Sequence, residues 1–208
     1  MDSDSNIWIE SFTRWIHVVA GITWIGHLYF FNFVNANLQP KLDGPTKKLV
    51  NPQLLPRALF WFRWGAMFTF LSGLLLFYLV YMHATGTAKN PNFFLPDGGI
   101  TNRGWWIIFG ALFGTVMWFN VWFVIWPAQK QIIPKVRDGV APDAAIVKRG
   151  ALFSKINTYL SVPLVAFMLS QHFGAWLGQP LVYIPMVIVV GFAGVWLWYK
   201  NAPKVQGM

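Results

Sequence analysis

Five long runs of apolar residues, separated by shorter polar stretches, dominate this chain of 208 residues. The runs are Phe12–Val34, Ala58–Met82, Trp105–Trp126, Thr158–Trp176 and Leu181–Tyr199. Each is close to the roughly 20 residues that an α-helix needs to cross about 30 Å of hydrocarbon. We therefore expect an all-α integral membrane bundle of five transmembrane helices, built as a single membrane domain over residues 1–208.

The basic residues lie mostly on one side of these predicted spans. The chain has 16 lysines and arginines, and Arg14, Lys89 and Arg103 lie on the opposite side from the rest. The others lie between the first and second runs, between the third and fourth, or after the fifth, and Arg63 lies just inside the second. Because positively charged loops stay in the cytoplasm, we expect the N-terminus outside and the C-terminus in the cytoplasm. The formal net charge of +9 then indicates contact with anionic membrane lipids, and no nucleic-acid partner is expected.

Composition supports the same class of protein. The chain is 56% hydrophobic and 11% charged, which is far from an average soluble domain. It has no cysteine, so disulfides, thiolate ligands for iron–sulfur clusters and covalently attached haem are excluded. The longest polar stretches are expected to be loops, the last with turn residues Gly139 and Pro142 before a short polar helix. These stretches are Asn35–Arg57, His83–Gly104 and Pro127–Asn157.

Two histidines in the predicted spans lie at matching depths. His17 lies about five residues, or about 8 Å, inside the outer end of the first span, and His172 lies at nearly the same depth in the fourth. Two neutral imidazoles that face each other across a bundle bind haem b through both axial positions. Gly21 and Met168 lie one helical turn below them, where a glycine lets a porphyrin approach. The alternative is that both histidines only form hydrogen bonds with neighbouring carbonyl groups.

The other two histidines have different surroundings. His83 lies at the outer mouth of the second span, where an interfacial histidine is common. His27 lies past the membrane midplane, at a depth similar to Asn120 and near Thr69. We expect a hydrogen-bonded polar cluster there, with a ligand or proton-relay role as the alternative.

Further polar groups gather at the cytoplasmic ends of the predicted spans, and two interpretations stay open. They are ordinary helix-end residues, or they form a small polar pocket for a quinone headgroup or an anionic substrate. The candidates are His27, Arg63, Asn120, Gln129 and Asn157. On the third span, the GxxxG pattern of Gly110 and Gly114 predicts close helix packing, with contact to a cofactor edge as the alternative.

Several segments together resemble a known family. Trp15–Gly26, Leu59–Trp64, Asn120–Lys130, Asn157–Pro163 and Ser170–Phe173 are similar, in order and spacing, to the membrane part of the bacterial membrane-bound urate hydroxylases, the urate oxidase N-terminal family. The chain looks like a shortened relative without the cytochrome c domain that members often carry. The resemblance implies a multi-pass protein of the bacterial inner membrane with an oxidoreductase function, and it retains His17 and His172.

The chain also departs from the family pattern. The resemblance places histidine at the position of Phe60, an acidic residue near Gly65 and histidine at the position of Ile156. If these groups serve urate chemistry or a second metal centre, this chain lacks them. The resemblance therefore favours haem at His17 and His172 and disfavours urate hydroxylation.

We expect a haem b protein that transfers electrons as a subunit or partner of a larger membrane redox complex. An external c-type cytochrome is the natural exchange partner, because the haem would lie near the outer surface. Two alternatives stay open: a cofactor-free accessory subunit of a respiratory or photosynthetic complex, and an enzyme that oxidises a small heterocycle such as urate. Quinone is a further candidate cofactor.

Overall fold

The computed structural model describes residues 3–83, 91–174 and 178–205, and all the regular secondary structure in this part is helical. Its one extended contact there is an isolated bridge between Phe94 and Ile100. Five helical segments are long and apolar enough to cross a membrane: Ile7–Lys41, Gly44–Met82, Asn102–Arg137, Ala144–His172 and Pro180–Lys204. The predicted all-α fold with five spans is confirmed, and the chain is a multi-pass membrane protein. The predicted end of the fourth span at Trp176 lies outside the described residues.

Three of the five segments contain a π-helical turn. The first consists of α1 (Ser3–Tyr29), the π turn η1 (Phe30–Asn35), α2 (Ala36–Leu38) and η2 (Gln39–Lys41). The second consists of α3 (Gly44–Phe77) and the π turn η3 (Tyr78–Met82). The third consists of α4 (Asn102–Phe119), the π turn η4 (Asn120–Ile125) and α5 (Trp126–Arg137). The last two consist of α6 (Ala144–Leu169) with η5 (Ser170–His172), and α7 (Pro180–Asn201) with η7 (Ala202–Lys204).

Most of the two stretches predicted as loops on the basic side are helical. α3 begins at Gly44, where the carboxylate of Asp43 accepts a hydrogen bond from the Thr46 amide at 2.8 Å, as helix N-caps do. Asp143 caps α6 in the same way, after a turn in which Gly139 has a φ of +74°. The helices therefore run past the apolar stretches at one end of the bundle. We call this end, formed by η2, the start of α3, the α5–α6 turn and the end of α7, the basic end.

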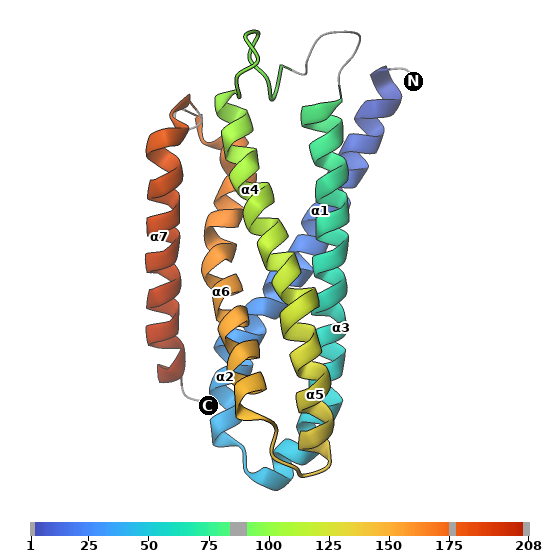
Figure 1. The fold of residues 1–208 in the computed structure, drawn as a ribbon, viewed down its shortest axis with the longest axis vertical. Helices are drawn as coiled ribbons and strands as arrows, with labels where there is room; N and C mark the ends of the chain where they lie inside the picture. Colours follow the sequence, from blue (N-terminus) through green and yellow to red (C-terminus); the bar gives the residue numbers. More distant parts are fainter. Residues whose placement is uncertain (1–2, 84–90, 175–177, 206–208) are drawn as a thin grey trace.

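The first helix crosses the bundle diagonally (Figure 1). Its N-terminal half lies along α3, whereas its other end reaches α7, where Tyr29 packs edge-on against Trp198 with ring centres 5.6 Å apart. α4 and α6 lie between α3 and α7, and the two chain termini lie toward opposite ends of the bundle (Figure 1). This tilt decides which side chains of α1 meet which partners.

Small residues lie where the helices approach most closely. A Cβ added at Gly65 of α3 would lie 3.0 Å from the backbone nitrogen of Trp24 on α1. At Gly110 of α4, the methyl group of Met168 on α6 fills the space that a Cβ would need. The packing predicted for Gly110 is therefore confirmed, and side chains such as Trp24 are fully buried behind these contacts.

Candidate functional site

His17 of α1 packs against α3. Its Nδ1 lies 3.1 Å from the hydroxyl oxygen of Ser72, and this hydroxyl donates a hydrogen bond to the carbonyl of Phe68. A Cβ added at Gly73 would lie 3.0 Å from Cε1 of the His17 ring. Because the Ser72 hydroxyl gives its hydrogen to a carbonyl, the neutral His17 ring donates from Nδ1. His17 thus links α1 to α3.

His172 lies elsewhere in the bundle. It belongs to η5 at the end of α6, and its side chain is exposed. The next residue, Phe173, packs against Trp106 of α4 with ring centres 6.2 Å apart. Because α1 crosses the bundle diagonally, its N-terminal half lies beside α3 and away from this end of α6 (Figure 1). His17 therefore packs on α3 and His172 is exposed at the end of α6, and their pairing across a haem stays a prediction.

The two residues predicted to flank the porphyrin are used in helix packing. Gly21 faces Thr69 of α3, whose Cγ2 would lie 3.9 Å from an added Cβ. Met168 fills the space at Gly110 of α4. Haem b between the first and fourth spans stays a prediction.

The polar cluster predicted around His27 is divided between separate helices. Nδ1 of His27 lies 2.7 Å from the carbonyl oxygen of Thr23, within its own helix. Thr69 likewise donates to the carbonyl of Gly65 at 2.7 Å. Short-range bonds of this kind satisfy polar side chains that have no partner on another helix. The expected contacts of His27 with Thr69 and Asn120 are therefore not formed.

Asn120 and Asn157 form a buried pair in the core. Nδ2 of Asn120 donates to Oδ1 of Asn157 at 2.8 Å, and Nδ2 of Asn157 donates to the carbonyl of Met117 at 2.9 Å. The second bond satisfies a backbone carbonyl next to the π turn η4. A satisfied polar pair of this kind fixes how two helices pack. We therefore interpret both residues as structural.

A polar cleft of about 600 Å³ opens at the basic end. Side chains from η1, η2, α3, α5 and α6 surround it, and the π turn η1 contributes several of them. Apolar residues such as Phe31, Leu59 and Ile133 complete its walls. The polar lining residues are Asn32, Asn35, Gln39, Lys47, Asn51, Gln129 and Ser154. Of the five sequence-based candidates for a polar site, only Gln129 lines this cleft.

Most amide groups of the polar cleft are held in place. Gln39 and Asn51 exchange two hydrogen bonds, each 2.9 Å long. Asn32 donates to the hydroxyl of Ser154 at 2.8 Å and accepts from the hydroxyl of Tyr199 at 2.8 Å. These bonds tie η1 and η2 to α3, α6 and α7, so one wall of the cleft is rigid.

Two polar side chains of the cleft are available for a ligand. Neither Lys47 nor Gln129 forms a side-chain hydrogen bond with another residue in the described part of the chain, and neither is fully exposed. Lys47 offers a positive charge, and Gln129 offers both donors and an acceptor. The cleft can therefore bind a small ligand through directed polar contacts.

Asp43 and Asp138, two acidic residues of the basic end, form hydrogen bonds at helix ends and do not line the cleft. Hydrogen bonds from Thr46 hold the pKa of Asp43 below its usual value. The hydrogen bond from Arg137 likewise lowers the pKa of Asp138. No carboxylate is among the described residues that line the polar cleft. Lys47 therefore sets the sign of its electrostatic potential, which favours anions.

One signal in the sequence pointed to part of this cleft. Asn32, Asn35 and Gln39 recur at spacings of three and four residues, which places them on one helical face. The signal was incomplete, because Asn35 and Gln39 lie, with Lys47 and Asn51, in the stretch Asn35–Arg57 that the sequence had suggested was a loop. The approach of Lys47 and Asn51 to η1 depends on the N-terminal extension of α3.

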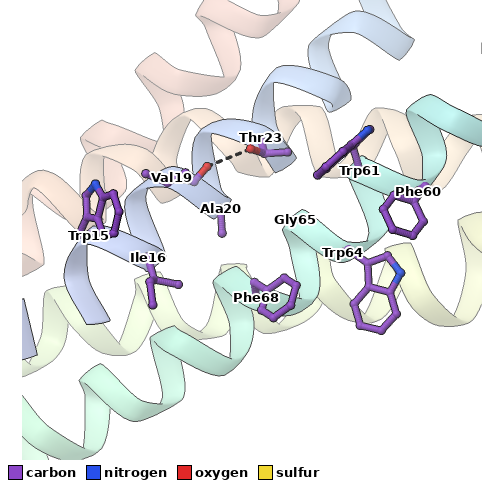
Figure 2. Close-up of a pocket in the computed structure, with 10 residues that line it drawn as sticks. All are labelled: Trp15, Ile16, Val19, Ala20, Thr23, Phe60, Trp61, Trp64, Gly65 and Phe68. Carbon is purple, nitrogen blue, oxygen red and sulfur yellow. Dashed lines mark hydrogen bonds between the residues drawn. The ribbon is translucent and has the colours of Figure 1, made fainter. Parts of the chain in front are cut away.

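A second, apolar groove of about 640 Å³ lies between α1 and α3 (Figure 2). Apart from the indole N–H groups of its tryptophans, its one polar side chain is Thr23, whose hydroxyl donates to the carbonyl of Val19 at 3.0 Å. Its lining residues are Trp15, Ile16, Val19, Ala20, Thr23, Phe60, Trp61, Trp64, Gly65 and Phe68. This apolar groove suits a hydrocarbon chain.

Two positions at which the resemblance expects polar residues line this apolar groove. Phe60 is 48% exposed and lines it, and Gly65 leaves no room for a larger side chain because the Trp24 backbone lies against it. The third position, Ile156, is an exposed residue of α6. Phe60 and Gly65 therefore give the groove an apolar wall.

Comparison with known proteins defines the family of this chain. No curated protein and no solved structure matched it. A family model described as Urate oxidase N-terminal matches residues 4–49, 42–89 and 93–206. These ranges cover nearly the whole sequence, so the chain belongs to the urate oxidase N-terminal family.

Proposed function

We propose that this protein binds a small anionic heterocycle of the urate class in the polar cleft, as the substrate-binding membrane part of an oxidoreductase. The observation that carries the proposal is the lining of the cleft. Its described residues include Lys47 and Gln129, which form no side-chain hydrogen bond with another described residue, and they include no carboxylate. We further propose that the basic end faces the cytoplasm of a bacterial inner membrane and that the protein works within a larger redox complex.

The chemistry of such a heterocycle matches the cleft. Urate is planar and anionic, and N–H donors alternate with C=O acceptors along its edges. An amide such as Gln129 pairs with one donor and one acceptor at once, and Lys47 offsets the charge. Apolar side chains such as Phe31 and Ile133 line the cleft and offer contacts to a flat ring, as in most small-molecule sites.

The headgroup of a quinone is the competing ligand. It offers carbonyl acceptors to the same side chains but carries no charge, so it gains less from Lys47. Haem b at His17 and His172 is a separate prediction, and no step of the proposal runs through it.

Binding of labelled urate to the detergent-purified protein, measured by equilibrium dialysis, tests the proposal. We expect saturable binding that the double variant Lys47→Ala/Gln129→Ala weakens by more than about tenfold, because hydrogen bonds to a charged ligand contribute roughly 1.5–3 kcal/mol. A short-chain benzoquinone added as competitor is expected to displace little of the urate.

A matched variant separates the cleft from general surface charge. Lys41→Ala/Gln131→Ala removes the same two residue types at the basic end, but neither residue lines the cleft. We expect this control to bind urate like the wild type. Equal losses in both double variants, or displacement of urate by low concentrations of benzoquinone, contradict the proposal.

A further inference from the structure

Arg63 of α3 is a cation without an acidic partner in the described part of the chain. Its Cζ lies 4.0 Å from the centre of the Trp126 ring, 5.2 Å from that of Trp122 and 5.8 Å from that of Trp64. Its Nε–H is buried and has no hydrogen-bond partner among the described residues. Cation–π contacts hold a guanidinium in place but leave its five N–H donors unused. Arg63 is thus positioned and still able to bind an anion.

Lys130 of α5 brings a second positive charge to the same ring. Its Nζ lies 5.9 Å from the centre of Trp126. Within the described residues the ion pairs are Arg14–Glu10 and Arg137–Asp138, so neither Arg63 nor Lys130 is neutralised. Two like charges beside one ring repel each other. A bound anion would relieve this repulsion.

The two cations lie at the ends of uncharged stretches in their spans. α3 and η3 carry no charged residue from Trp64 to Met82, a stretch that spans roughly 28 Å at 1.5 Å per residue and so fills the hydrocarbon layer. Arg63 therefore lies at its edge. The third segment is likewise uncharged between Arg103 and Lys130.

The apolar groove adjoins this pair of charges. Trp64 lines the groove and also packs edge-on against Trp122, with ring centres 5.7 Å apart. In Figure 2 the groove runs along α3 from Phe60 and Trp61 past Trp64 to Phe68. A ligand with an anionic head at Arg63 therefore has an apolar channel beside it, which a free phosphate ion would not use.

We propose that Arg63 and Lys130, which both lie beside the Trp126 ring, bind the phosphodiester group of an anionic phospholipid, with one acyl chain in the apolar groove. The site differs from the polar cleft, whose lining includes neither cation. Basic residues near a membrane surface each contribute to anionic lipid binding.

Native mass spectrometry of the detergent-purified protein tests this proposal. Phosphatidylglycerol, phosphatidylcholine and inorganic phosphate are titrated separately. We expect one tightly bound phosphatidylglycerol, weaker phosphatidylcholine binding and no comparable retention of phosphate. The double variant Arg63→Gln/Lys130→Gln is expected to bind phosphatidylglycerol about tenfold or more weakly, since each cation near the surface contributes about 1 kcal/mol.

Two further variants make the result specific. Lys148→Gln/Arg149→Gln removes one lysine and one arginine from the exposed surface of α6 at the same end and is expected to bind like the wild type. Arg63→Lys keeps the charge and guards against misfolding as the cause of lost binding. It is expected to retain most of the affinity. Equal binding of both lipids, equal losses in the two double variants, or phosphate bound as tightly as lipid overturns the proposal.

Discussion

At the residue scale, the histidines show that two residues predicted at the same membrane depth need not contact each other. His17 and His172 have similar positions along their helices, yet His17 is bonded to Ser72 of α3 and His172 is exposed. Depth follows from counting residues along a helix. The rotation and tilt of that helix follow from its neighbours. A pair inferred from depth alone therefore requires packing information that the sequence lacks.

The arrangement predicts different outcomes for the two histidine variants. His17→Ala removes the bond to Ser72 and the ring that packs on Gly73. We therefore expect the free energy of unfolding to fall by roughly 1–3 kcal/mol, which lowers the thermal midpoint of the detergent-purified protein. His172→Ala is expected to change neither this midpoint nor the reduced-minus-oxidised absorption spectrum. Circular dichroism and difference spectroscopy measure these quantities. If the wild-type protein shows a haem b spectrum and both variants abolish it, His17 and His172 are the haem ligands, as the sequence predicts.

At the element scale, the close contact between α1 and α3 depends on Gly65. A Cβ there meets backbone atoms of Trp24, which cannot move aside as a flexible side chain can. We expect Gly65→Ala to push the helices apart and to cost roughly 1–3 kcal/mol, as overpacking does. The loss is measured as a lower thermal midpoint in detergent.

Gly26 of α1 provides the matched control. Nothing lies within 4 Å of a Cβ added there, and alanine favours the helical state more than glycine does. Gly26→Ala is therefore expected to leave the midpoint unchanged or raise it. If the two variants behave alike, the α1–α3 contact is looser than the structure indicates.

The elements also show what could be predicted from the sequence. The spans follow from long apolar runs, because an uncharged stretch of that length is stable chiefly as a helix across the hydrocarbon layer. The helical extensions at the basic end were missed because α3 there contains Pro52, Pro56 and several charges, which are typical of a polar loop. The wall of the polar cleft that α3 forms was not predicted from the sequence for the same reason. Asn51 meets Gln39 only because α3 starts at Gly44 and folds back along η2.

At the scale of the whole molecule, charge and structure predict how the protein lies in the membrane. The five spans place the two termini toward opposite ends of the bundle (Figure 1). Because basic segments stay on the cytoplasmic side, we expect a fluorescent protein fused after Met208 to be fluorescent. Alkaline phosphatase inserted between Asp97 and Gly98, where Gly98 has a φ of +90° in a turn, is expected to be active on the outside.

The same two fusions decide how ligands reach the polar cleft. With the basic end inside, a substrate enters the cleft from the cytoplasm, and the lipid bound at Arg63 belongs to the inner leaflet. Reversed activities of the two fusions would place the cleft on the outer surface and the lipid in the outer leaflet. If both fusions reported from the same compartment, the prediction that an odd number of spans separates the two fusion sites would be contradicted.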